Sequence, residues 1–143
     1  MGTFYGYSIW YKFDHRLKLI IMGSHPLNLG IRFILEVVAL VAAGMWGWKL
    51  TDSWLRFVLV IGLPLLLAAI WVTFAVPDDP SRSGSAPIVT PGLVRLLIEL
   101  GIFAFATWAF YDLGHLRMTI AFAVVVVIHY AVSYDRIMWL LAR

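Results

Sequence analysis

The sequence predicts an all-α integral membrane protein with four transmembrane helices, arranged as two tandem helical hairpins. Of its 143 residues, 62% are hydrophobic and 13% are charged, and the mean hydropathy is +0.89. A soluble domain averages about 45–50% apolar and about 25% charged residues. Four apolar segments are long enough to cross a bilayer core of ~30 Å, and an Arg/Glu pair recurs in the first and third of them.

We expect the transmembrane domain to cover residues 26–143, with spans at about 28–49, 54–75, 92–111 and 116–141. The first span follows the helix-breaking sequence His25–Pro26, so Asn28 is its expected N-cap. Within it, Ala39, Ala43 and Gly47 are spaced by four residues. Such a stripe of small residues allows a neighbouring helix to pack closely.

The second span contains Pro64 near its middle. Proline removes a backbone hydrogen bond and kinks a helix, and transmembrane helices tolerate this where neighbouring helices compensate. We therefore predict a kink at Pro64. The fourth span is longer than a perpendicular crossing needs, so we expect it to be tilted or to project from the bilayer.

The loop 77–91 is rich in Pro, Ser and Gly and should be flexible and solvated. Asp78 and Asp79 lie in it, and two adjacent carboxylates without further oxygen ligands favour a solvated loop over a cation site. Residues 1–25 combine aromatic and basic side chains, which fits either an interfacial segment or a poorly ordered tail. A start of the functional protein at Met22 is a further alternative.

The distribution of Lys and Arg predicts the orientation in the bilayer. The loop 77–91 and the two ends of the chain share one side, where basic residues exceed those of the two short turns. The positive-inside rule therefore places both termini in the cytoplasm. The residues counted on that side are Lys12, Arg16, Lys18, Arg82, Arg136 and Arg143, and those of the turns are Lys49, Arg56 and Arg117.

A short internal repeat supports the arrangement in hairpins. The sequence IRFILE at 31–36 aligns without gaps to VRLLIE at 94–99, and each segment is followed by aromatic residues and a second apolar span. Because each unit contains two spans, both units enter the membrane from the same side. Repeats of this kind are related by a pseudo-twofold axis along the membrane normal.

The repeat places Arg32, Glu36, Arg95 and Glu99 inside the membrane, which makes them the central candidate site. Each charge costs at least ~2.5–3.5 kcal/mol to insert, so the glutamates should bind arginines or become protonated. One interpretation is a proton- or cation-coupled binding site between the first and third helices. The other is a structural staple of two Arg–Glu pairs, which is favoured because each glutamate has an arginine one turn away.

A second polar group lies in the fourth span, where His129, Tyr130, Tyr134 and Asp135 form a strip toward the cytoplasmic side. A proton relay, a haem ligand and a hydrogen-bonded helix interface are the alternatives. Bis-histidine haem needs a second buried histidine, and the remaining histidines lie outside the spans or at their edges. We therefore favour the polar interface and expect no cofactor and no metal site.

Composition and motifs argue against several classes of function. The chain has no cysteine, which excludes disulfides and thiolate chemistry. A net charge of +3 without a basic patch does not indicate nucleic-acid binding. No nucleophile–base pattern or phosphate-binding glycine loop is present, so we do not expect an enzyme.

Five motifs stand out along the spans: Asn28-Leu29-Gly30-x-Arg32-Phe33-x-Leu35-Glu36, Trp46-Gly47, Gly62-Leu63-Pro64, Trp71-x-x-Phe74-x-x-Pro77 and Arg95-x-x-x-Glu99. Together they resemble the YrdB-like family, small bacterial integral membrane proteins of unassigned function. The resemblance spans about residue 26 to the end of the fourth span. It implies a four-helix protein of the bacterial cytoplasmic (inner) membrane without supplying an activity.

Two classes of function follow. The first is a structural or accessory membrane protein, with the lipid bilayer and a second copy or another membrane protein as partners. The self-paired charges and the small-residue stripe favour it. The second is a proton-coupled transporter or channel-like protein for small cations or apolar compounds, which would need a glutamate free to exchange protons.

Overall fold

The computed structural model describes residues 25–79 and 85–143, and these residues form five helices. Three of the helices are long and apolar enough to cross a membrane, and a bent pair of helices is a fourth candidate span. The prediction of an all-helical chain is confirmed, and the apolar helices indicate a membrane protein. The predicted N-terminal segment lies outside the described residues, apart from His25.

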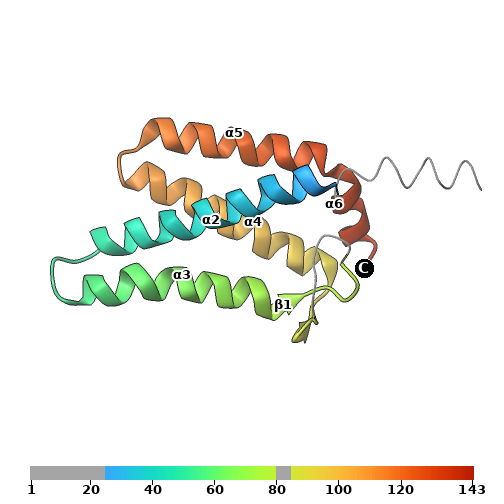
Figure 1. Ribbon diagram of the computed structural model, residues 1–143, viewed down its shortest axis with the longest axis horizontal. Coiled ribbons are helices and arrows are strands. Elements are labelled where there is room, and N and C mark those ends of the chain that lie inside the picture. Colours follow the sequence, from blue (N-terminus) through green and yellow to red (C-terminus); the bar gives the residue numbers. More distant parts are fainter. Residues whose placement is uncertain (1–24, 80–84) are drawn as a thin grey trace, which may run out of the picture.

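Two helices, α2 (Pro26–Lys49) and α4 (Gly92–Asp112), form the middle of the bundle. The helix α3 (Leu55–Thr73) lies along α2 on one outer side, and α5 (Leu116–Val132) lies along α4 on the other (Figure 1). A short helix, α6 (Tyr134–Leu141), lies across the end of the bundle where α2 begins (Figure 1).

The helix α2 begins earlier than predicted. Pro26 occupies its first turn, where its missing N–H costs nothing, and His25 is the N-cap, with its Nδ1 accepting the Leu27 N–H at 3.3 Å. The prediction of Asn28 as the cap is therefore wrong. Asn28 instead faces the bundle and donates to the Ser133 hydroxyl at 2.7 Å.

The core lies mainly between α2 and α4, where alanines let the two helices come close. Phe103 of α4 stacks edge-on against Phe122 of α5, with ring centroids 6.0 Å apart. The buried residues of this core are Leu35, Ala39, Ala42, Ile102, Phe103, Ala106, Ala109, Phe110 and Phe122.

Of the small-residue stripe predicted in the first span, Gly47 packs against α3, whereas Ala39 belongs to the core described above. A Cβ atom placed on Gly47 would lie 2.7 Å from the carbonyl oxygen of Leu59, so only glycine allows this approach. In the part of the chain that the structure describes, α3 itself contributes no buried residue. It is therefore attached to the bundle through one side. Pro64 lies within α3, which is continuous through it, and the predicted kink stays a prediction.

The connection after α3 is more ordered than the sequence predicts. The helix ends at Thr73, and β1 (Phe74–Ala75) pairs in parallel with β2 (Ile88–Val89), with Phe74 opposite Ile88. The Thr90 N–H extends this pairing by donating to the Ala75 carbonyl at 2.9 Å. This short pairing holds the beginning of α4 beside the end of α3.

The fourth predicted span, 116–141, is wrong as a single helix. The chain breaks at Ser133, and α6 turns from α5 by 69°. The backbone of α6 packs directly on Gly92, where an added Cβ would lie 1.9 Å from the Leu140 carbonyl oxygen. The turn directs Arg136 of α6 into a cluster of charges inside the bundle, and the contacts that Arg136 makes there stabilise the break.

Candidate functional site

The candidate site is centred on Glu99, whose side chain is 1% exposed. Its Oε1 accepts hydrogen bonds from Arg32 Nη2 at 2.8 Å and from Arg95 Nε at 2.9 Å. Its Oε2 accepts from Arg136 Nη1 at 2.9 Å and from the Tyr130 hydroxyl at 3.2 Å. Both carboxylate oxygens are thus occupied, and the donors come from α2, α4, α5 and α6.

Arg136 holds Glu99 through two parallel hydrogen bonds. Its Nη1 donates to Oε2 and its Nη2 donates to Oε1 at 2.9 Å. This is the bidentate geometry typical of a guanidinium and a carboxylate. The same Nη2 lies 3.1 Å from Oδ2 of Asp79. Asp79 is 7% exposed, so its predicted place in a solvated loop is wrong. Its charge is stabilised by the neighbouring Arg136 guanidinium.

Arg95 joins the cluster to the end of α3. Its Nη1 donates to the carbonyl of Trp71 at 2.6 Å and to the carbonyl of Phe74. The last carbonyls of a helix lack partners within the helix and carry its negative dipole end, so a cation is favourable there. The indole of Trp71 also packs against Arg95 and Arg32, with the guanidinium carbons 5.0 and 5.7 Å from the ring centroid.

Glu36 is less enclosed than Glu99. Its Oε1 accepts from Arg32 Nε at 3.0 Å, and its side chain is 27% exposed. Arg32 therefore bridges the two glutamates, binding Glu36 on its own helix and Glu99 on α4. Glu36 also lines a small cavity of about 130 Å³ between α2, α3 and α4, next to Leu67 and Trp71.

The cluster is balanced in charge when all of its groups are ionised, with three arginines facing Glu36, Asp79 and Glu99. Buried ion pairs are retained where geometry and extra hydrogen bonds compensate for their lost hydration, and Glu99 satisfies both conditions. Among residues 25–79 and 85–143, no group of three His, Asp or Glu side chains is placed to hold a metal ion. The arrangement is suited to holding helices together.

The polar strip predicted along the fourth span is divided by the break at Ser133. Tyr130 reaches Glu99, whereas Tyr134 is exposed on α6. His129 is 6% exposed, and its Nδ1 has no hydrogen-bond partner among the described residues. Asp135 is half-buried on α6. These four residues therefore do not form one continuous row.

The structure brings together the four predicted residues Arg32, Glu36, Arg95 and Glu99, and adds groups that sequence reasoning missed. The sequence analysis placed Asp79 in the solvated loop 77–91 and counted Arg136, near the end of the fourth predicted span, among the basic residues of the cytoplasmic side, and it gave Ser133 no role. The available signal was weak, since it consisted of one acidic residue in a loop and one basic residue near the end of an apolar segment. Their contribution depends on the bend between α5 and α6.

Comparison with known proteins agrees with the resemblance noted in the sequence. The family described as "Protein of unknown function (DUF2568)" matches residues 30–127. The chain is 42% identical over 114 residues to "Uncharacterized protein YrdB" of Bacillus subtilis (strain 168), a match that covers 80% of this chain and 93% of that protein. No solved structure matches the chain significantly. The chain therefore belongs to the DUF2568 family, whose function is unknown.

Proposed function

We propose that this protein is a structural or accessory component of the bacterial cytoplasmic membrane, in which the charge cluster is a permanent staple. The observation that supports the proposal most directly is the burial and the hydrogen bonding of Glu99. Both of its oxygens are bound by arginines, and it is 1% exposed. A carboxylate that couples transport to protons must be released at some stage to meet a proton or a substrate, and Glu99 is held by three cations at once.

The staple joins parts of the chain that are far apart in sequence. Arg32 and Glu99 are 67 residues apart, and Arg136 and Glu99 are 37 residues apart. The cluster therefore links the beginnings of α2 and α4 to α6 and, through Arg95, to the end of α3. We place this end of the bundle at the cytoplasmic side, together with both termini, following the distribution of basic residues.

The same contacts support two tandem hairpins, α2–α3 and α4–α5, related by a pseudo-twofold axis along the membrane normal. Arg32 of the first hairpin and Arg95 of the second both donate to Oε1 of Glu99. The two arginines therefore lie at the same depth, as a parallel repeat requires.

A second copy of this chain or another membrane protein is the partner that we propose for an accessory role. The surface that favours this is α3, which contributes no buried residue among those described and exposes Phe57, Ile61 and Leu65. The mass of the protein in a mild detergent would show whether a second copy is bound.

Proton-coupled transport is the second candidate function, and Glu36 is the residue that favours it. Its carboxylate is 27% exposed beside a small cavity lined by apolar residues and Trp71. The cation that it already binds, Arg32, opposes this role, because a substrate cation would have to replace an arginine that is part of the cluster.

Glu99→Gln and Glu36→Gln distinguish the two functions. Breaking a buried pair costs about 3–5 kcal/mol, because the remaining charge is left without compensation. Glu99→Gln leaves three arginines facing two carboxylates, so we expect it to lower the free energy of unfolding by this amount. Glu36→Gln should cost about 1 kcal/mol or less, because its pair is partly exposed. Unfolding in detergent micelles, followed by circular dichroism, measures both.

A proton-flux assay in liposomes completes the test. For a structural staple, the wild-type protein should give no pH change beyond that of empty liposomes. Flux that depends on wild-type Glu36 and is abolished in Glu36→Gln would establish the second function instead. A Glu99→Gln variant as stable as the wild type would contradict the staple.

A further inference from the structure

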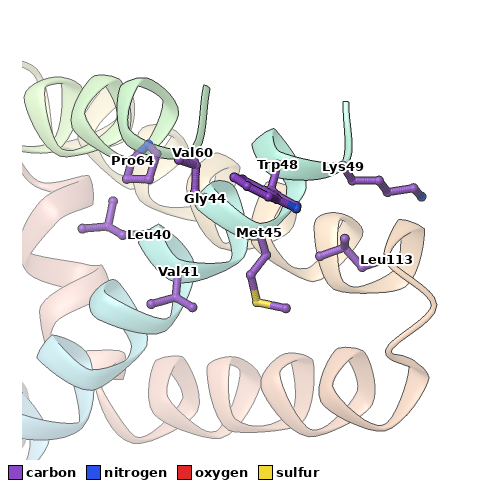
Figure 2. Close-up of a pocket in the computed structure, with 9 residues that line it drawn as sticks. All are labelled: Leu40, Val41, Gly44, Met45, Trp48, Lys49, Val60, Pro64 and Leu113. Atoms are coloured by element: carbon purple, nitrogen blue, oxygen red, sulfur yellow. The ribbon is translucent and has the colours of Figure 1, made fainter. Parts of the chain in front are cut away.

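A groove of about 640 Å³ is lined by residues of α2 and α3 and by Leu113 at the end of α4 (Figure 2). It extends to Lys49, the last residue of α2, whereas the charge cluster lies near the beginning of α2. This volume is within the range of ~300–1,000 Å³ that is typical of ligand sites. The walls are apolar except at one end, where Lys49 lies. The apolar residues that define the groove include Leu40, Val41, Gly44, Val60, Pro64 and Leu113.

The length of the groove matches one leaflet of a bilayer. Leu40 and Lys49 mark opposite ends of its α2 side (Figure 2) and are nine residues apart. At ~1.5 Å per residue this is ~14 Å along the helix. Half of a hydrocarbon core of ~30 Å is ~15 Å. The groove therefore runs from the headgroup level, where α2 ends, to about the middle of the membrane.

Lys49 lies at the mouth of the groove, and its ammonium has one hydrogen-bond donor that no described residue accepts. The Lys49 ammonium is 48% exposed and donates to Asp112 through Oδ2, at 2.9 Å, and through the backbone carbonyl. An ammonium has three donors, so one is left over among the contacts of the described residues. The neighbouring Trp48 ring also lines the groove. The guanidinium carbon of Arg56 lies over this ring, 4.6 Å from its centroid.

We propose that this groove binds one anionic phospholipid, with an acyl chain along α2 and α3 and the phosphate at Lys49. An acyl chain is the apolar group of the right length, and the phosphate supplies an acceptor for the unused Lys49 donor. Arg56 lies over Trp48 and is paired with Asp52, and Arg117 lies at the start of α5. With Lys49 and Asp112, this end of the bundle therefore has three basic and two acidic residues, a net charge of +1. A second copy of this chain would also fill the apolar walls, whereas a phosphate in addition supplies an acceptor for the Lys49 donor that Asp112 does not use.

The test is native mass spectrometry of the delipidated full-length protein, titrated with phosphatidylglycerol or with phosphatidylcholine bearing the same acyl chains. We expect one phosphatidylglycerol to bind more tightly than phosphatidylcholine. Lys49→Gln should weaken phosphatidylglycerol binding about fivefold, the contribution of one basic residue at an anionic lipid surface. Its effect on phosphatidylcholine should be much smaller.

Asp112→Asn separates lipid binding from stability. It removes the acidic partner of Lys49 while leaving the ammonium charged, so phosphatidylglycerol should bind more tightly although the Lys49–Asp112 pair is lost. Loss of binding in this variant would overturn the proposal, because it would show that the ion pair merely maintains the shape of the site.

Val41→Trp tests the apolar part of the groove, since Val41 lines it and its side chain is half exposed. It should weaken binding of both lipids, whereas Val127→Trp, at an exposed position on α5 outside the groove, should weaken neither. Equal binding by the two tryptophan variants would contradict the proposal. A dimer that disappears only in Val41→Trp would identify a second copy of the chain as the occupant instead.

Discussion

Glu99 and Glu36 occupy matching places in the repeat but have different surroundings. Glu99 receives hydrogen bonds from three arginines and a tyrosine, whereas Glu36 is bound by Arg32 and borders a small cavity. The difference arises because α5 and α6 supply Tyr130 and Arg136 to the second site, while α3 has no basic residue in its last turn. Matching residues in a repeat can therefore have unequal effects on stability.

For single residues, we predict that substitutions of His129 and Tyr130 have different effects on stability. His129 Nδ1 is buried without a partner among the described residues, while the Tyr130 hydroxyl donates to Glu99. A buried polar group without a hydrogen bond costs ~1–3 kcal/mol. His129→Phe should therefore leave the melting temperature unchanged or raise it.

Tyr130→Phe is the comparison, because it removes one hydroxyl and keeps the ring. It should lower the free energy of unfolding by about 0.5–1.5 kcal/mol, the net value of one hydrogen bond. Melting temperatures of both variants in the same detergent provide the measurement. A His129→Phe protein that is less stable than Tyr130→Phe would show that the imidazole has a polar partner after all.

At the scale of the elements, α6 depends on the absence of a side chain at position 92. The backbone of Leu140 occupies the space where a Cβ on Gly92 would lie. Gly92→Ala must therefore displace α6, and with it Arg136. We expect this single methyl group to lower the melting temperature and to expose residue 140, which is fully buried in the wild type.

Gly101→Ala is the matched control, since nothing lies within 4 Å of a Cβ at this position of the same helix. It should be neutral or stabilising by about 0.5–1 kcal/mol, because alanine is the better helix former. Introducing Leu140→Cys provides the readout, as its thiol should react with a maleimide in the Gly92→Ala background and be protected with Gly101→Ala. Equal protection in both backgrounds would show that α6 does not rest on Gly92.

The helices themselves were predictable, because long apolar runs leave little choice of structure in a membrane. The pairs Arg32–Glu36 and Arg95–Glu99 were also visible, since residues four apart share a helix face. The bend at Ser133 could not be predicted from the sequence. Neither proline nor glycine marks it, and its cause lies in contacts with Gly92 and Glu99, which are distant in sequence. Arg136 and Asp79 could not be assigned to the cluster without it.

For the whole molecule, the orientation in the membrane is the prediction that most needs a direct measurement. The chain has no cysteine, so single cysteines report on accessibility without background. Ser53→Cys and His115→Cys lie in the two turns, and Ser85→Cys and Arg143→Cys lie at the opposite end. With both termini in the cytoplasm, a membrane-impermeant maleimide should label the first two in intact spheroplasts and the last two only after permeabilisation. The opposite pattern would invert the proposed topology.

The ion pairs within single helices have a consequence for biosynthesis. Arg32 is synthesised 67 residues before Glu99, and Glu99 is synthesised 37 residues before Arg136. The whole of α2 and α3 is therefore synthesised before Glu99, the distant partner of Arg32. Arg32 then has Glu36 beside it, and Arg95 later has Glu99, so each helix can enter the lipid as a nearly neutral unit at a lower insertion cost than two separate charges. Assembly of the cluster then adds partners inside the bilayer while both of these pairs are kept, and it is completed when Arg136 arrives.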